Sequence, residues 1–148
     1  MTCKPPSVHQ DGITVHGTNR NDQIVGTEGD DHLWGGKGDD TFRGEGGEDV
    51  IHGEAGNDLF IFGSSQSAFV DGGQAGKWTD IIDMTDQSMH LTGHYDGGWT
   101  AQVEHEMVTV TDPNQHGVLD HLQNASGTIT FNATGDVIQF QNIDKIEW

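Results

Sequence analysis

An aspartate recurs at every ninth position over the first part of the chain. It is the sixth residue of five consecutive nine-residue units, and these residues are Asp22, Asp31, Asp40, Asp49 and Asp58. Regularly spaced carboxylates either bind a hard cation or form a solvated acidic face. Five positions in phase favour cation binding, so the backbone that carries them must bring the carboxylates close together.

Glycine and apolar residues share the same period. The five units are GTNRNDQIV (17–25), GTEGDDHLW (26–34), GGKGDDTFR (35–43), GEGGEDVIH (44–52) and GEAGNDLFI (53–61). Glycine permits tight turns in the first six residues of a unit, and the last three residues suit a β-strand. Alternating turns and strands form a coil of two units per circuit, in which strands one circuit apart pair in parallel. One inner face then carries Ile24, Phe42 and Phe60, and the other carries Leu33 and Ile51.

This apolar interior is too small to fold the repeats alone. Each buried apolar side chain contributes roughly 1.5–3 kcal/mol, whereas ordering each residue costs roughly 1–2 kcal/mol of backbone entropy. In addition, Asp22, Asp40 and Asp58 stack along one edge and repel one another, as do Asp31 and Asp49 on the other. A cation between neighbouring turns removes this repulsion and recruits glycine-rich backbone carbonyls. Hard oxygen ligands in irregular geometry select Ca²⁺, so we expect folding and calcium binding to be one event.

Composition narrows the class of protein. The chain has 148 residues, with 24 Asp and Glu against 6 Lys and Arg, and a formal charge of −18. Such an acidic chain repels nucleic acids and anionic membrane surfaces. Cys3 is the single cysteine, so no internal disulfide forms. The first residues lack the apolar stretch of a signal peptide, and no run approaches the ~20 apolar residues of a spanning helix.

The remaining chain divides into four segments. Residues 1–16 are a lead-in with a short strand at 13–15, and residues 62–70 are a link. Residues 71–83 resemble a sixth unit stretched by an insertion, with Asp80 as its expected ligand. Residues 84–148 are a β-rich cap, with strands expected at 99–103, 107–111, 128–131 and 137–140 and a hairpin turn at 132–135. The predicted fold is therefore all-β, a parallel β-roll over residues 17–83 with a small C-terminal cap.

The units resemble the G-G-x-G-x-D-x-U-x repeat of the RTX (hemolysin-type calcium-binding nonapeptide) family. The resemblance covers residues 17–61, and 71–83 loosely, and implies a β-roll with Ca²⁺ between its turns. It also implies type I export of a bacterial protein, with an uncleaved secretion signal within residues 84–148. The sixth-position aspartates, Asp80 included, would be side-chain ligands. Carbonyls of the first four positions would complete the sites, among them Gly26, Gly29, Gly35, Gly38, Gly44, Gly47, Gly53 and Gly56.

Pairing units one circuit apart gives about three well-formed calcium sites, with more at the ends. Arg20 replaces glycine at the fourth position of the first unit, which predicts a weaker site there. His90 and His94 have the i, i+4 spacing of a zinc motif but lack the HExxH glutamate, so surface histidines are favoured over a zinc site. Trp78, Tyr95 and Trp99 either stack on sugars or, as we expect, pack the cap.

The sequence thus predicts a non-enzymatic, calcium-binding module that folds on Ca²⁺ binding. Its expected source is a type I-secreted bacterial protein, located outside the cell or at the cell surface. The alternative is a calcium-stapled structural, adhesin or glycan-binding subunit of a surface or viral assembly. The chain offers no nucleophile elbow, and RTX enzymes carry their chemistry in separate domains.

Overall fold

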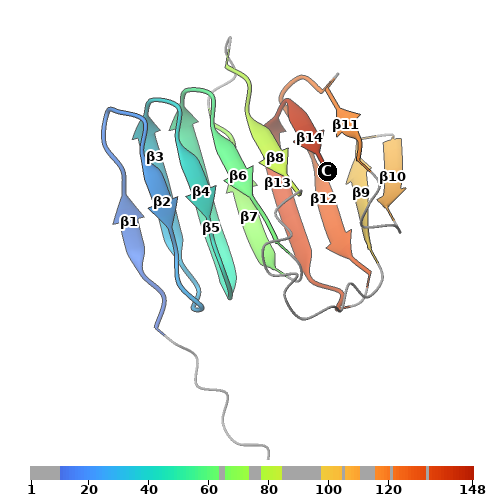
Figure 1. The fold of residues 1–148 in the computed structure, drawn as a ribbon, viewed down its shortest axis with the longest axis horizontal. Coiled ribbons are helices and arrows are strands. Elements are labelled where there is room, and N and C mark those ends of the chain that lie inside the picture. Colours follow the sequence, from blue (N-terminus) through green and yellow to red (C-terminus); the bar gives the residue numbers. More distant parts are fainter. Residues whose placement is uncertain are drawn as a thin grey trace, which may run out of the picture.

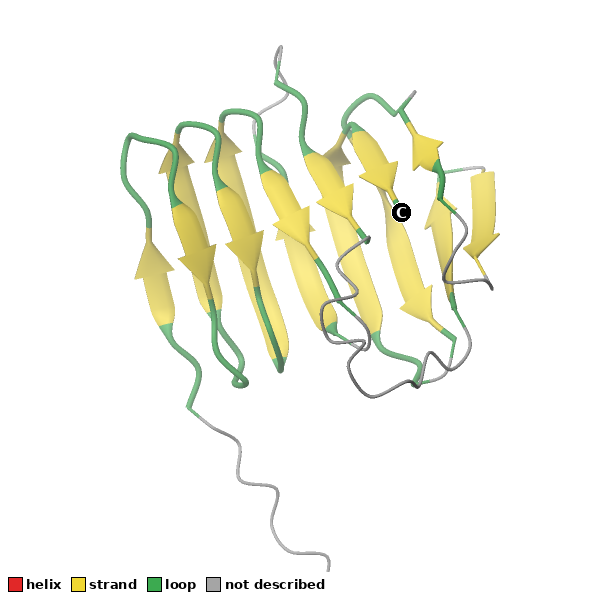
Figure 2. Ribbon diagram, in the orientation of Figure 1, coloured by secondary structure: helices red, strands yellow, loops and turns green. Residues whose placement is uncertain are grey.

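The structure is a computed structural model that describes residues 11–63, 66–73, 78–84, 98–104, 106–110, 116–120, 122–132 and 134–148. All regular elements in these residues are strands, as Figure 2 shows. Among them no helix is long and apolar enough to cross a membrane. The predicted all-β class is confirmed.

The strands form two sheets that lie one behind the other (Figure 1). The larger sheet has the order β1-β3-β5-β7-β13-β12-β9-β10, and the smaller has the order β11-β14-β8-β6-β4-β2. The bounds are β1 Thr14–His16, β2 Gln23–Val25, β3 His32–Lys37, β4 Thr41–Arg43, β5 Glu48–Ala55, β6 Leu59–Ile61, β7 Ser67–Asp71, β8 Ile81–Asp83, β9 Trp99–Val103, β10 Glu106–Val110, β11 Val118–Leu119, β12 Ala125–Phe131, β13 Val137–Ile143 and β14 Lys145–Glu147.

Strands β2 to β8 form the predicted parallel roll, and β1, which lies in the predicted lead-in, adds one more strand by pairing in parallel with β3. The chain alternates between the sheets, so that odd-numbered strands enter the larger sheet and even-numbered strands the smaller one. Leu33 lies beside Ile51 in one sheet, and Phe42 lies beside Phe60 in the other. These pairs are one circuit of two units apart, as the nine-residue period predicts. The repeats therefore stack as a β-solenoid.

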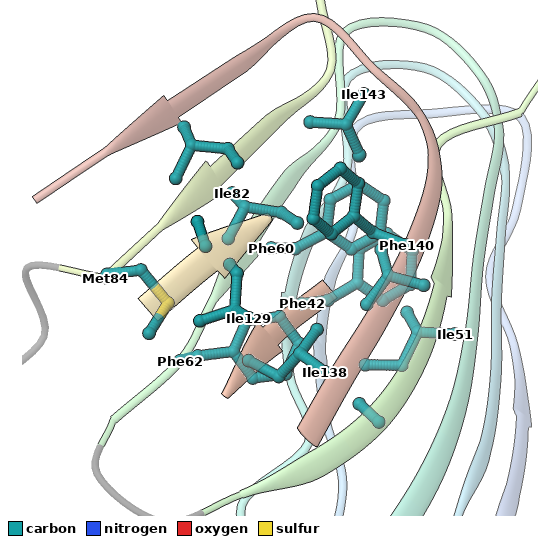
Figure 3. Close-up of a cluster of buried hydrophobic side chains, with 14 of the residues drawn as sticks. Phe42, Ile51, Phe60, Phe62, Ile82, Met84, Ile129, Ile138, Phe140 and Ile143 are labelled. Carbon is teal, nitrogen blue, oxygen red and sulfur yellow. The ribbon is translucent and has the colours of Figure 1, made fainter. Parts of the chain in front are cut away.

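The core is the space between the two sheets. All five repeat residues predicted to face inward are buried, and the rings of Phe42 and Phe60 stack with centroids 5.1 Å apart. The rows continue beyond the repeats, because Val70 and Phe140 follow in the larger sheet and Ile82 and Ile146 follow in the smaller sheet. Figure 3 shows side chains from both regions meeting in one cluster.

The C-terminal region is β-rich, with β9, β10 and β12 in antiparallel pairing. Its predicted strands at 99–103, 107–111, 128–131 and 137–140 overlap β9, β10, β12 and β13 over the described residues, and β12 and β13 pair antiparallel on either side of the predicted turn. Residues 62–70 differ from the expected link, because residues 67–71 form β7, a further strand of the roll. Ala68 occupies the register position beside Asp49, so the aspartate that would have marked this strand is missing.

Candidate metal centre along the two edges of the roll

The turns of the roll form two edges, each with its own column of aspartates. Among the described residues, the first edge includes residues 17–22, 35–40, 53–58, 72–73 and 78–80, and the second includes residues 26–31 and 44–49. Five of the six predicted side-chain ligands are almost completely buried: Asp31 0%, Asp40 1%, Asp49 3%, Asp58 1% and Asp80 3% exposed. These carboxylates therefore face the turns and not the solvent.

One oxygen of each stacked carboxylate belongs to a backbone ladder. On the first edge, the Oδ1 of Asp40 accepts the N–H of Asp22 at 2.8 Å, and the Oδ1 of Asp58 accepts the N–H of Asp40 at 2.9 Å. The Oδ1 of Asp80 accepts the N–H of Asp58 at 2.9 Å, which places Asp80 in the same column despite the insertion before it. On the second edge, the N–H of Asp31 donates to Asp49 at 3.0 Å.

The other carboxylate oxygen lacks a donor at the centre of the first edge. The Oδ2 atoms of Asp40 and Asp58 are buried and have no hydrogen-bond partner among the described residues. A buried anionic oxygen without a partner costs several kcal/mol, because the water that solvated it has been removed. A cation at this position would compensate that cost.

Backbone carbonyls converge on these same oxygens. A Cβ added at Gly35 would lie 2.3 Å from Asp40 Oδ2 and 2.8 Å from the Gly53 carbonyl oxygen, and one at Gly53 would lie 2.2 Å from Asp58 Oδ2 and 2.6 Å from the Gly72 carbonyl oxygen. Each first-position glycine thus leaves open the space between its own carboxylate and the carbonyl of the next turn. Two acceptors that share one space require a donor or a cation.

The second edge repeats this arrangement in part, because there the Thr27 N–H already donates to Asp31 Oδ2 at 2.5 Å. A Cβ at Gly26 would lie 2.3 Å from Asp31 Oδ2 and 2.5 Å from the Gly44 carbonyl oxygen, and one at Gly44 would lie 2.1 Å from Asp49 Oδ2. Side chains alone bring no group of three acidic, His or Cys residues together among the described residues. The carbonyl of Gly44 beside Asp31 is a further oxygen of the kind that Ca²⁺ accepts as a ligand.

The predicted fourth-position glycines shape these turns. Gly38, Gly47 and Gly56 have φ of 117°, 87° and 145°, a conformation that side chains disfavour. They also stack closely on the preceding circuit, since a Cβ at Gly47 would lie 2.5 Å from the carbonyl carbon of Gly29. Arg20, at the corresponding place in the first unit, lies against Gly38.

Threonine occupies the second position of the first two units, and its hydrogen bonds to the aspartate were not predicted from the sequence. The Thr18 N–H and Oγ1 donate to Asp22 Oδ2 at 2.6 and 2.8 Å, and the Oγ1 of Thr27 donates to Asp31 Oδ1 at 3.0 Å. A threonine hydroxyl bonded to an aspartate competes with a metal ion for the same lone pairs. The sequence contains the difference, because the later units have glycine or glutamate at the second position, where the first two units have threonine.

Burial changes the acidity of the column. Loss of water and neighbouring carboxylates raise the pKa of Asp49, Asp58 and Asp80 to about 7, although a backbone N–H donor to each opposes the shift. Burial raises the pKa of Asp40 as well. Without a cation, the edges of the roll resist full ionisation at neutral pH, so a bound cation would stabilise both the charge and the fold.

The remaining candidates do not join this centre. Trp99 is 4% exposed and packs edge-on against Trp148 with ring centroids 5.3 Å apart, as expected for a residue of the core. Trp78 is 45% exposed. His90, His94 and Tyr95 lie outside the described residues.

Comparison with known proteins identifies the repeat. Residues 16–50 and 38–65 match the sequence model of the RTX calcium-binding nonapeptide repeat, which comprises 4 copies. The suspected family is therefore confirmed for this segment, and these residues form a calcium-binding β-roll module. No curated protein and no solved structure shows significant similarity to the chain.

Proposed function

We propose that this chain, whose residues 16–65 are RTX calcium-binding nonapeptide repeats, is a module that folds when Ca²⁺ binds between its turns. The observation that carries the proposal is the pair of buried oxygens, Asp40 Oδ2 and Asp58 Oδ2, each opposite the carbonyl of the next turn and without a donor. The predicted ligands Asp22 and Asp80 extend the same column, and Asp31 and Asp49 form the column of the second edge.

The electrostatics explain why folding would depend on the ion. When the chain is extended, its carboxylates are hydrated and far apart. Coiling the chain stacks them in two columns, with neighbours one circuit apart, and burial there raises the pKa values of Asp49, Asp58 and Asp80. Calcium bound there supplies the positive charge that lets the carboxylates stay ionised. The chain's own residues shape the site, because the ladder of backbone N–H donors orients each carboxylate and the first-position glycines leave room for the carbonyl of the next turn.

Calcium titration with two readouts tests this function. Isothermal titration calorimetry should show several bound Ca²⁺ ions per chain, and far-UV circular dichroism should show β structure appearing over the same concentration range. Magnesium is the control, because its small octahedral shell suits a cage of backbone carbonyls poorly. Equal β structure in calcium and in chelator would overturn the proposal.

The cellular setting follows from the same dependence. RTX repeats occur typically in secreted bacterial proteins, so we propose type I export of an unfolded chain and folding in the calcium outside the cell. The geometry adds one condition: residues 137–148 form β13 and β14, which lie within the two sheets of the folded protein. A secretion signal there would have to be read before the roll forms. Secretion of a C-terminal fusion, with and without those residues, tests this part.

A cavity on the outer face of the larger sheet favours a second candidate function, glycan binding. Its volume is about 660 Å³, and its lining includes Trp34, Lys37, His52, Glu54 and Asp71. The imidazole of His52 stacks on the indole of Trp34 with centroids 5.7 Å apart, so ring edges and charged groups face the cavity together. Such a mixture suits a ligand rich in hydroxyl groups. Binding to a glycan array that is lost in Trp34→Ala but kept in Trp78→Ala would support it.

Neither candidate includes catalysis, and we propose that the module is not an enzyme. A panel of hydrolase substrates, assayed with calcium present, tests that assignment. Turnover that disappears in a variant of the cavity, such as Glu54→Gln, would contradict it.

A further inference from the structure

The last two strands of the chain form one more circuit of the roll. β13 pairs in parallel with β7, and β14 pairs in parallel with β8, so that both sheets continue past the repeats. Ile146 lies beside Ile82 at the same inward register as Phe42 beside Phe60. The chain between these circuits contains more than fifty residues, so no sequence period connects them.

Asp144 continues the aspartate column of the first edge. The N–H of Asp80 donates to Asp144 Oδ2 at 3.2 Å, as each earlier aspartate donates to the one below it. The backbone agrees, because the N–H of Lys145 donates to the Asp80 carbonyl at 3.1 Å, just as that of Ile81 donates to the Asp58 carbonyl at 2.9 Å. The turn at 142–144 is thus equivalent to the repeat turns although it contains no glycine.

The pairing of carboxylate and carbonyl also recurs at this level. A Cβ added at Gly72 would lie 2.7 Å from Asp80 Oδ2 and 2.2 Å from the Asn142 carbonyl oxygen. This matches the convergence at Gly53, where the carboxylate oxygen of Asp58 is buried and has no partner among the described residues. Asp80 is itself only 3% exposed.

Side-chain amides fix the position of that last carbonyl. The Nδ2 of Asn142 donates to Asp71 Oδ1 at 2.8 Å, and the Nε2 of Gln141 donates to Asp71 Oδ2 at 2.8 Å. Asn142 has φ of 56°, which asparagine tolerates better than most residues. Both oxygens of Asp71 are thereby engaged, which leaves the Asn142 carbonyl oriented toward Gly72.

The second edge ends differently, because a side chain takes the place of an ion. Gln66 is 9% exposed; its Oε1 accepts the N–H of Gly63 at 3.3 Å, and its Nε2 donates to the carbonyl of Glu45. Ala68 replaces aspartate beside Asp49 at this level. An amide donor already satisfies this carbonyl, so within the described residues the aspartate column of the second edge ends at Asp49, whereas that of the first edge reaches the C-terminal strands.

We infer that a further calcium ion binds beside Gly72, between Asp80 and the turn at 142–144, with Asp80 Oδ2 and the Asn142 carbonyl among its ligands, and that it fastens β13 and β14 to the roll. This inference rests on the proposed function and extends the ion column beyond the nonapeptide repeats. It gives the C-terminal segment a calcium-dependent attachment that no repeat motif encodes.

Asp80→Asn in the full chain tests the inference, with the exposed Asp120→Asn as a control that removes the same charge elsewhere. Calorimetry and native mass spectrometry should count one ion fewer in Asp80→Asn than in Asp120→Asn or wild type. In saturating calcium, amide hydrogen exchange at Asp144 and Lys145, both bonded to the Asp80 carbonyl, should accelerate at least ~10-fold. Exchange in β4 should stay unchanged.

An unchanged ion count, or a lost ion with unchanged exchange at residues 144 and 145, would overturn the inference. If the wild type binds no calcium, the proposed function fails as well; if Asp58→Asn loses an ion and Asp80→Asn does not, only this inference fails. Should Asp80→Asn not fold, crystals of the wild type with calcium decide. Anomalous density between Asp80 and Asn142 would support the site. Anomalous density beside Asp40 with none between Asp80 and Asn142 would refute it.

Discussion

Replacing Asp58 by asparagine should have opposite effects with and without calcium. Asp58 is 1% exposed, its Oδ1 accepts the Asp40 N–H at 2.9 Å, and its Oδ2 has no partner among the described residues. Asparagine keeps the accepting oxygen, removes the charge and can place an N–H donor near the Gly72 carbonyl. The calcium-free roll should therefore gain stability, and the calcium-bound roll should lose a charged ligand.

The pKa gives the size of the first effect. Burial raises the pKa of Asp58 from 3.8 to about 7, a change of roughly three units at 1.36 kcal/mol each. Keeping this carboxylate ionised at pH 8 thus costs the calcium-free fold up to about 4 kcal/mol, which Asp58→Asn removes. In the presence of calcium we expect at least a ~10-fold weaker apparent affinity, equivalent to about 1.4 kcal/mol.

Far-UV circular dichroism at pH 8 measures both effects in one titration. Sucrose in the buffer favours compact states, so that the calcium-free roll becomes populated enough to compare. Asp58→Asn should show more β signal in chelator than the wild type and a higher calcium midpoint, whereas the exposed Asp120→Asn should change neither by as much. An Asp58→Asn protein with less structure in chelator, or with an unchanged midpoint, would refute the reasoning.

Three further predictions concern the edges of the roll. Burial raises the folded-state pKa values of Asp49, Asp58 and Asp80 to about 7, so the calcium-free fold should lose stability as pH rises from about 4 to 7. In calcium, the fold should gain stability over the same range. Thermal midpoints measured across that range check both slopes. Gly53→Ala would put a methyl 2.2 Å from Asp58 Oδ2 and should remove an ion in calorimetry, whereas Gly46→Ala, with its nearest contact at 3.2 Å, should keep it. Glu54→Gly should raise the free energy of unfolding in urea by about 1 kcal/mol, because Glu54 has a φ of 74°, a strained conformation for a residue with a side chain. Glu54→Gln separates this relief of backbone strain from the loss of charge.

Much of the roll could be predicted because its period is uninterrupted. A fixed spacing of two units places Phe42 on Phe60 and Asp22 over Asp40, whatever the intervening residues are, since each circuit has the same length. The apolar residue at the eighth position and the aspartate at the sixth were therefore sufficient to predict both the inner rows and the edge columns. Asp80 was found because the sequence around it still ends in an aspartate and two isoleucines.

The period fails where the chain inserts or replaces residues. The sequence predicts a link over residues 62–70 because no aspartate of the repeat occurs there, although Val70 packs beside Ile51 in β7. Asp144 could not be found, because its turn lacks glycine and follows a long antiparallel excursion through β9, β10 and β12. Only the hydrogen bonds of Asp80 to Asp144 and Lys145 reveal that this turn belongs to the same column.

The chemistry of individual carboxylates also needed coordinates. Sequence spacing treats the five repeat aspartates as equivalent, yet Thr18 donates to Asp22 while Asp40 has an oxygen without a partner among the described residues. The difference arises at the second residue of each unit, which is threonine in the first unit and glycine in the third. Sites at the centre of the first edge are accordingly expected to bind calcium before the site at Asp22.

Crystals grown with calcium, measured at a wavelength where calcium scatters anomalously, test the central idea most directly. The account predicts discrete peaks on the first edge, between Asp40 Oδ2 and the Gly53 carbonyl and between Asp58 Oδ2 and the Gly72 carbonyl. Ordered turns at those positions with water or side-chain donors facing the two carboxylates, and no anomalous peak, would contradict it.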